Sequence, residues 1–202
     1  MRIRPKDFIA IDNKLFFAVV CGYQEDNHVL TFLRYIKDNA GMHKLTTKKA
    51  EKIIRESYPE FQFNSSYIDV KLHGIPIDMI KKIYYPEETV KKLLNTKIPD
   101  DKKRDAIDAI KYLQSIGCKT GNIGITGSIM LGTYNECSDI DVIIYGREVF
   151  LKIRKHIKNS LAIGELNPLN QVMWKDAYER RDCSLSFNDF YSHEIRKFNK
   201  FI

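Results

Sequence analysis

The sequence predicts an α/β protein in two parts, a small strand-rich α+β domain over residues 1–96 and an α/β domain over residues 97–202. Three observations support this prediction. Strand-like apolar runs dominate the first part. Helical and strand patterns alternate in the second part. Between them, the stretch 95–99, which ends in proline, is the best candidate for a domain boundary.

The first part opens with a predicted hairpin. Residues 15–20 and 29–36 are apolar runs rich in β-branched and aromatic side chains. The intervening Glu-Asp-Asn at residues 25–27 offers turn chemistry that joins the two strands. The aromatic side chains of this region are expected to pack in a core, because they alternate with aliphatic residues.

A helix and a further strand are expected after the hairpin. Thr46 or Thr47 can cap the helix, apolar residues follow it at helical spacing, and Pro59 ends it. Residues 67–72 then alternate between apolar and polar side chains, which indicates a half-buried strand. The sequence His-Gly-Ile-Pro at residues 73–76 is expected to break that strand.

The remaining pattern is mostly helical with two short strands. One helix begins at Pro86, because proline is favoured in a first turn, and another begins at Asp100–Asp101 and ends near Gly117. Strands are predicted at residues 122–126 and, as a central strand, at residues 139–145, with a short helix around residues 129–131 between them. Further helices are predicted at 147–159, 168–181 and 187–200.

The charge of the chain is unevenly distributed. Its net charge is +7, yet residues 99–146 carry 7 acidic and 5 basic side chains, whereas residues 1–98 and 147–202 are basic. An acidic centre between basic segments suits a polyanionic substrate held against divalent cations. RNA or another polyanionic acceptor is therefore a candidate partner.

Composition also excludes several classes of protein. No run of about 18 apolar residues occurs, so no membrane span is expected. The charged residues 1–7 lack the apolar core of a signal peptide, and we expect a cytoplasmic protein. The 4 cysteines lack the paired spacing of a structural zinc site, and the 5 histidines lack a metal-binding pair.

Two aspartates, Asp139 and Asp141, are the strongest candidates for chemistry. If residues 139–145 form a strand, positions i and i+2 share one face, roughly 6.6 Å apart along the chain. Ile140 would then point into the core, and the apolar residues after Asp141 would be buried. Two carboxylates so placed can hold the divalent cations that phosphoryl transfer uses, whereas without a cation they would repel each other.

Gly127 and Ser128 lie in the turn between a predicted strand and a predicted helix. Backbone N–H groups at such a turn form an anion site, to which the serine hydroxyl adds a hydrogen bond. Glycine leaves room for the close approach of a triphosphate. The alternative is an ordinary turn followed by two surface aspartates, but the joint spacing favours a functional motif.

Gly127-Ser128 followed ten residues later by Asp139-Ile140-Asp141 resembles the signature of DNA polymerase β-type nucleotidyltransferases. The run from Thr126 is especially similar to an uncharacterised archaeal group of that superfamily. The resemblance implies a core of a short mixed sheet with flanking helices. It also implies Mg²⁺ or Mn²⁺ at the two aspartates, the triphosphate of an NTP at the glycine and serine, and transfer of a nucleoside monophosphate to an acceptor hydroxyl.

The resemblance further implies a third carboxylate. Glu165 is the best internal candidate and Asp182 a weaker one. The sequence ends at Ile202, before a further acidic strand that the archaeal group would carry, so we expect a shortened chain whose turnover is open to question. The alternative function is thus a catalytically inactive nucleotide- or RNA-binding module. The N-terminal part, residues 1–96, would recognise the acceptor, which the sequence does not identify as RNA, protein or small molecule.

Overall fold

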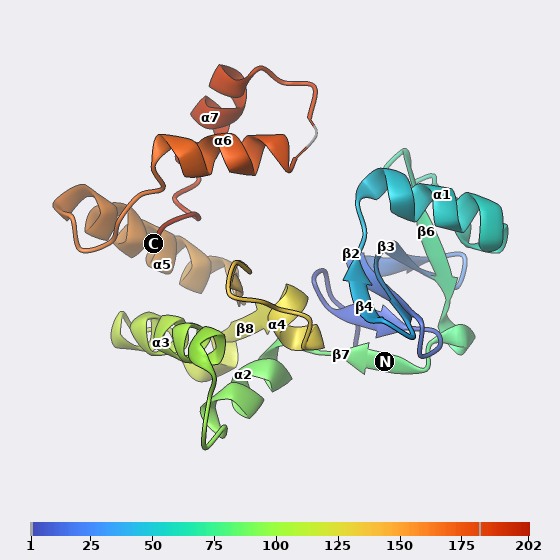
Figure 1. The fold of residues 1–202 in the computed structure, drawn as a ribbon, viewed down its shortest axis with the longest axis horizontal. Helices are drawn as coiled ribbons and strands as arrows, with labels where there is room; N and C mark the ends of the chain where they lie inside the picture. Colours follow the sequence, from blue (N-terminus) through green and yellow to red (C-terminus); the bar gives the residue numbers. More distant parts are fainter. Residues whose placement is uncertain (1, 182) are drawn as a thin grey trace. The chain divides into compact units, whose positions relative to one another are not determined.

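A computed structural model describes residues 2–181 and 183–202 (Figure 1). The chain forms two compact units, of which the first contains Met1–Ile110 and Ile123–Ile143. The second contains Lys111–Asn122 and Ile144–Ile202. The sequence-based division between residues 96 and 97 stays a prediction. The expected fold class, an α/β protein with a strand-rich N-terminal region, is confirmed.

An antiparallel sheet dominates the first unit. Its strands run in the order β5-β6-β3-β2-β1-β7, and β4 pairs with β3. Neighbours in this order are mostly close in sequence, so short connections join them. The strands are β1 (Phe8–Ala10), β2 (Leu15–Glu25), β3 (His28–Asp38), β4 (Gly41–Lys44), β5 (Gln62–Ser65), β6 (Val70–Pro76) and β7 (Lys82–Tyr84).

The predicted hairpin is confirmed in β2 and β3. Asp26 and Asn27 occupy the turn with φ of 47° and 62°, the left-handed region that Asp and Asn tolerate better than most residues. The strand pairing contains an irregularity farther along, where Phe16 is opposite Tyr35 but Phe17 is opposite Leu33. One residue of β3, Arg34, is therefore a bulge between two paired positions.

The predicted helix after the hairpin is also confirmed, as α1 (Thr47–Ser57). The Thr46 hydroxyl accepts a hydrogen bond from the Lys49 backbone N–H, which satisfies one of the donors that a helix start leaves without a partner. The helix buries Ala50 and Ile54 and ends just before Pro59, which begins the short 3₁₀ helix η1 (Pro59–Phe61).

The prediction that residues 73–76 break a strand is wrong. Strand β6 continues through them to Pro76, while residues 66–69 lie between β5 and β6. The physical reason lies at Gly74, where a Cβ would stand 2.7 Å from the Phe63 side chain on the neighbouring strand. The glycine therefore permits a close approach within the sheet instead of ending it.

The two faces of this sheet carry different clusters of apolar side chains. Phe16 and Phe17 are adjacent in β2, but because side chains alternate along a strand they join opposite faces. The face that packs against α1 buries Ile9, Ile11, Leu15, Phe17, Val19, Val29, Leu33, Leu45, Ala50, Ile54, Phe61 and Ile75. The opposite face buries Phe8, Ala10, Phe16 and Tyr35.

The first unit also includes the segment that carries the candidate site. Helix α2 (Pro86–Leu94) begins at proline as predicted and contacts strand β8 (Ile123–Thr126). Helix α4 (Gly127–Leu131) follows β8 directly. Strand β9 (Asp141–Ile144) pairs with β8.

Strand β9 differs from the predicted central strand in length and burial. It begins at Asp141, so Asp139 and Ile140 precede it. The sheet that it forms with β8 has two strands among the described residues, so the prediction of a central strand is wrong. Val142 is exposed and Ile143 only half-buried, in contrast to the predicted burial. An apolar run alone does not reveal how many neighbouring elements cover a strand.

Helices make up most of the second unit, and the predicted helical segments are confirmed there. Trp174 is buried on α6 and makes an edge-to-face contact with Phe190 on α7. The ends of the observed helices differ from the predicted ends by a few residues, as is usual for helix termini. The helices are α5 (Arg147–Ile163), α6 (Gln171–Glu179) and α7 (Phe187–Ile195), and α3 (Asp101–Ser115) runs from the first unit into this one.

Among the described residues, none of the helices has the length and apolar character needed to cross a membrane.

Candidate functional site

The glycine turn and the second aspartate are in direct contact. Gly127 follows β8 with φ of 70°, a conformation that glycine adopts without strain. A Cβ placed on Gly127 would overlap Oδ2 of Asp141, the first residue of β9. Glycine is therefore required here on two grounds, its backbone conformation and the adjacent carboxylate. From the sequence alone, glycine was expected here only because it leaves room for the close approach of a triphosphate.

Asp139 lies two residues before Asp141 but outside the strand. Both side chains are exposed. The expectation that the two acids share one face of one strand is therefore corrected, because only Asp141 has strand geometry. The two carboxylates nevertheless influence each other, since the negative charge of Asp139 raises the pKa of Asp141. The loop before β9 thus brings the first acid near the second without a strand.

Several charges act on the Asp141 carboxylate. Desolvation by the surrounding protein is the largest influence and raises its pKa, although the residue as a whole keeps a solvent-exposed side. Lys44 has the next largest effect and lowers the pKa, Asp139 raises it, and Lys6 and Arg34 lower it. The second acid therefore lies within the field of one neighbouring anion and three cations.

Arg34 and Lys44 come from the N-terminal sheet, which packs against α4, and Lys6 comes from the turn that precedes β1. The Thr126 hydroxyl donates a hydrogen bond to the Lys6 carbonyl oxygen at 2.8 Å, immediately before the glycine turn. Met130 and Leu131 of α4 pack against the apolar cluster that includes Tyr35. The sheet thus contributes side chains to the surroundings of the two aspartates.

Ser128, the second residue of the turn, is half-buried on α4. Its carbonyl oxygen accepts a hydrogen bond from the Thr133 backbone N–H at 2.9 Å, where Gly132 ends the helix in the left-handed conformation. Helix α4 is therefore five residues long, and it begins at the glycine turn and ends before Gly132. A role of Ser128 in binding a triphosphate stays a prediction.

The donor chemistry at the two aspartates fits a hard divalent cation. Both side chains supply carboxylate oxygens, the ligands that Mg²⁺ prefers, and a cation would offset the repulsion that raises the pKa of Asp141. Within residues 2–181 and 183–202, no group of three or more His, Cys, Asp or Glu side chains is placed to hold a metal ion. A divalent cation at this pair would therefore take further ligands from water or from substrate phosphates.

Of the two candidates for a third carboxylate, the structure describes Glu165. Glu165 belongs to the second compact unit, where its Oε2 accepts a hydrogen bond from the Ser160 hydroxyl at 2.8 Å, just beyond the end of α5. This hydrogen bond gives the Glu165 carboxylate a partner within its own unit. Asp182 lies outside the residues that the structure describes.

Four residues near Asp141 were not predicted from the sequence to belong to the site, namely Lys6, Arg34, Tyr35 and Lys44. Tyr35 was expected only to pack in a core, and it is indeed buried. Its pKa is raised by burial first, while Arg34 lowers it and Asp141 raises it, so the phenol lies near both charges. The sequence carries no signal for this proximity, because it arises from contacts between residues about a hundred positions apart.

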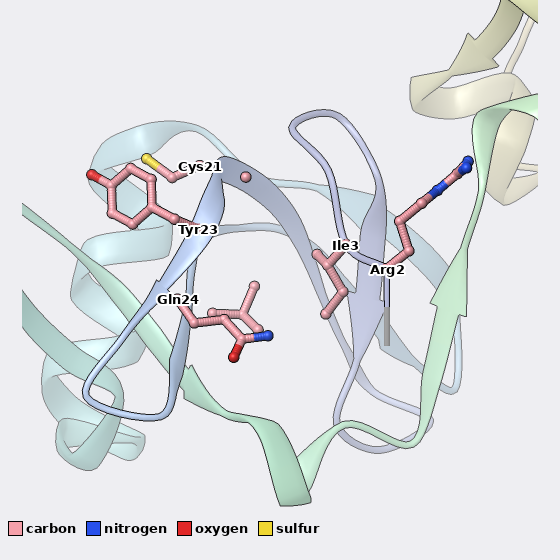
Figure 2. Close-up of a pocket in the computed structure, with 7 residues that line it drawn as sticks. Arg2, Ile3, Cys21, Tyr23 and Gln24 are labelled. Carbon is pink, nitrogen blue, oxygen red and sulfur yellow. The ribbon is translucent and has the colours of Figure 1, made fainter.

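A shallow pocket elsewhere in the first unit has a different character. It measures about 320 Å³ and is lined by residues of the N-terminal segment and of β2 and β3 (Figure 2). The Arg2 guanidinium points away from the other labelled side chains and forms an ion pair with Glu87 at 2.5 Å. The lining contains neither of the aspartates nor the glycine turn.

Comparison with known proteins is consistent with this geometry. Residues 107–181 match the nucleotidyltransferase domain family, which confirms the resemblance identified in the sequence. An uncharacterised protein of Methanocaldococcus jannaschii is 29% identical in an alignment that covers 99% of this chain and 65% of that protein. The chain thus spans about 65% of the length of the curated relative it matches. No solved structure matches the chain.

Proposed function

We propose that the protein transfers a nucleoside monophosphate from an NTP to an acceptor hydroxyl. The premise is the match of residues 107–181 to the nucleotidyltransferase domain. Nucleotidyl transfer is the general activity that this domain supports. The observation that carries the finer proposal is the contact between the Asp141 carboxylate and Gly127, with Asp139 close enough to raise the pKa of Asp141.

In the proposed reaction, the acceptor oxygen forms a bond to the α-phosphorus, and the bond from that phosphorus to the pyrophosphate oxygen breaks. The hydroxyl proton passes to solvent water, and pyrophosphate leaves with the electron pair of the broken bond. Asp139 and Asp141 would hold Mg²⁺ or Mn²⁺, which when bound neutralises charge on the phosphates. Gly127 and Ser128 would receive the triphosphate, because the start of a helix leaves backbone N–H groups without partners inside the helix. Residues 1–96 would recognise the acceptor.

Incubation with α-labelled NTPs, Mg²⁺ or Mn²⁺, and mixed RNA and protein acceptors tests this proposal. We expect Asp139→Ala and Asp141→Ala each to abolish label transfer. Asp105→Ala is a matched control, because this exposed acid on α3 forms an ion pair with Lys102 away from the glycine turn. Surface pairs of that kind contribute at most about 1 kcal/mol, so the control should label normally. Label transfer that survives both site substitutions would contradict the proposed roles.

The same experiment separates the enzyme from its alternative, an inactive module that binds nucleotide or RNA. Such a module would bind an NTP in equilibrium dialysis, and the two aspartate variants would weaken that binding, yet no acceptor would become labelled. The alternative takes its support from the absence of a third metal-binding side chain beside the pair among the described residues. Transfer of label to any acceptor by the wild-type chain rejects it.

A further inference from the structure

We propose that Lys6, Arg34 and Lys44, all from the N-terminal sheet region, form a polyphosphate-binding cluster beside Asp139 and Asp141. The cluster would take the β- and γ-phosphates of the NTP. This inference rests on the proposed function and extends it, because it assigns part of the nucleotide site to the region expected to recognise only the acceptor.

Lys6 is held next to the glycine turn by its backbone. Its carbonyl oxygen accepts the hydrogen bond from the Thr126 hydroxyl at 2.8 Å, and its N–H donates to the Val19 carbonyl at 3.0 Å. These two bonds anchor the residue both to the sheet and to the end of β8. The Lys6 side chain is exposed. Its backbone contacts Thr126, the residue immediately before Gly127, so Lys6 lies close to the glycine turn.

Arg34 is directed by the bulge in β3. In a regular strand, adjacent side chains point to opposite faces, so Arg34 would lie on the face opposite Tyr35. The extra residue in the bulge removes that constraint, and bulges commonly redirect a side chain in this way. Two effects agree with this direction, since the positive charge of Arg34 lowers the pKa of both Tyr35 and Asp141.

Lys44 is the last residue of β4 and lies opposite Tyr35 in the strand register. Tyr35 belongs to the buried cluster against which Met130 and Leu131 of α4 pack. Strand pairing therefore brings Lys44 to the same side of the sheet as α4 and the acidic segment. Its side chain is exposed, so it can reach a ligand without loss of core packing.

The balance of charge favours a polyanion at this place. Three cations act on the Asp141 carboxylate, and a divalent cation held by the two aspartates would add further positive charge. A triphosphate would offset this excess, and its phosphate oxygens accept charge-assisted hydrogen bonds from Lys and Arg. The Asp141 carboxylate also contacts the glycine turn, so the cluster lies on the side where the proposed function puts the triphosphate.

The test measures binding of Mg²⁺–ATP, ADP, AMP and inorganic tripolyphosphate by titration calorimetry to the full chain and to Lys6→Ala, Arg34→Ala and Lys44→Ala. We expect each variant to bind ATP and tripolyphosphate about tenfold more weakly, the loss of one charge-assisted contact, while AMP binding is unchanged. Lys44→Arg should restore most of the affinity. Lys37→Ala is the matched control, because Lys37 is an exposed cation on β3 that is not among the largest influences on the pKa of Asp141.

Circular dichroism and thermal melts verify that each variant is folded. Wild-type affinity for ATP in all three variants overturns the cluster but leaves the proposed function intact. A wild-type chain that binds neither ATP nor tripolyphosphate overturns both. Unchanged ATP binding combined with weaker binding of an RNA oligonucleotide would assign these cations to the acceptor and also overturn the proposal. Normal ATP binding with no labelling of any acceptor would contradict the proposed transfer alone.

Discussion

One face of the N-terminal sheet packs against α1 in a closed apolar core, whereas the other receives α4 and, with it, the segment that carries the aspartates. Both faces are built from the same strands, as the adjacent Phe16 and Phe17 illustrate. The closed face is the larger cluster and contains most of the fully buried side chains of the sheet. The other face is smaller and is bordered by charged residues.

This difference separates stability from function within one sheet. Substitutions on the closed face should lower the free energy of unfolding without a specific effect on nucleotide binding. Those on the face that receives α4 should weaken nucleotide binding beyond any loss of stability, because α4 begins at Gly127.

Truncation of Phe17 should give the largest loss of stability. The side chain is fully buried on the closed face and contacts Phe61 edge to face, with ring centroids 6.1 Å apart. Phe17→Ala removes this packing and leaves a cavity, so we expect the free energy of unfolding to fall by about 3–5 kcal/mol. Urea unfolding followed by circular dichroism measures the change. A loss below about 1 kcal/mol would contradict the closed face as the main core.

Acid should destabilise the closed face through His73. Burial lowers its pKa to about 4, and Nδ1 accepts a hydrogen bond from the Leu33 N–H at 2.8 Å, so the folded chain holds the neutral ring. The unfolded chain has a pKa of about 6.5 and binds the proton first as the pH falls. The contribution of His73 to the free energy of unfolding, fully present above pH 6.5, should therefore decline by about 3 kcal/mol toward pH 4.

Urea unfolding at a series of pH values measures this decline. His73→Asn keeps an acceptor for the Leu33 N–H and removes the titrating ring, so the difference in stability between the wild type and this variant should change by about 3 kcal/mol over the same range. His156→Asn serves as the control, because His156 is exposed on α5. A His73→Asn variant with the wild-type pH dependence would assign the acid sensitivity to other groups.

Local features of the fold were predictable from the sequence, because neighbouring residues determine them. Asp26 and Asn27 form the hairpin turn, and Thr46 caps α1, as their side-chain chemistry predicts. The similarity of residues 107–181 to the nucleotidyltransferase domain was equally predictable, since the glycine–serine turn and the aspartates form a short, specific motif. Those features require no knowledge of how distant segments pack.

Features that depend on distant contacts were not predictable. Gly74 looked like a strand breaker, because nothing in the sequence reveals that Phe63 crosses closely over it. Arg34 is redirected by a bulge that exists only in the pairing of β2 with β3. The location of Lys44 beside Asp141 likewise depends on the packing of α4 against the sheet. The sequence thus indicated the acids of the candidate site but not the cations.

Substitutions at Gly127 and Gly132 separate the effect of backbone strain from the effect of displacing the Asp141 carboxylate. Gly127 and Gly132 have nearly equal φ, 70° and 71°, so alanine at either position should cost about 1–2 kcal/mol of stability. Only at Gly127 would the new Cβ overlap the Asp141 carboxylate, since nothing lies within 4 Å of a Cβ at Gly132. Gly127→Ala should therefore reduce label transfer by about a hundredfold, the effect of displacing a reacting group by roughly 1 Å. Equal activity in the two variants would contradict a role for the Gly127–Asp141 contact.

The smallest effect is expected from a matched pair of partly buried side chains, Met130 on the face that receives α4 and Ile53 on the closed face. Alanine at either position removes a similar apolar area and should lower the free energy of unfolding by about 1 kcal/mol. Met130 connects α4 to the sheet, so its truncation loosens the element that begins at Gly127, and we expect tripolyphosphate affinity to fall about threefold, or about 0.7 kcal/mol. Ile53→Ala lacks that connection and should bind as the wild type does. Calorimetric titration of both variants at matched ionic strength measures the difference, and equal affinities would mean that the two faces do not divide stability from binding.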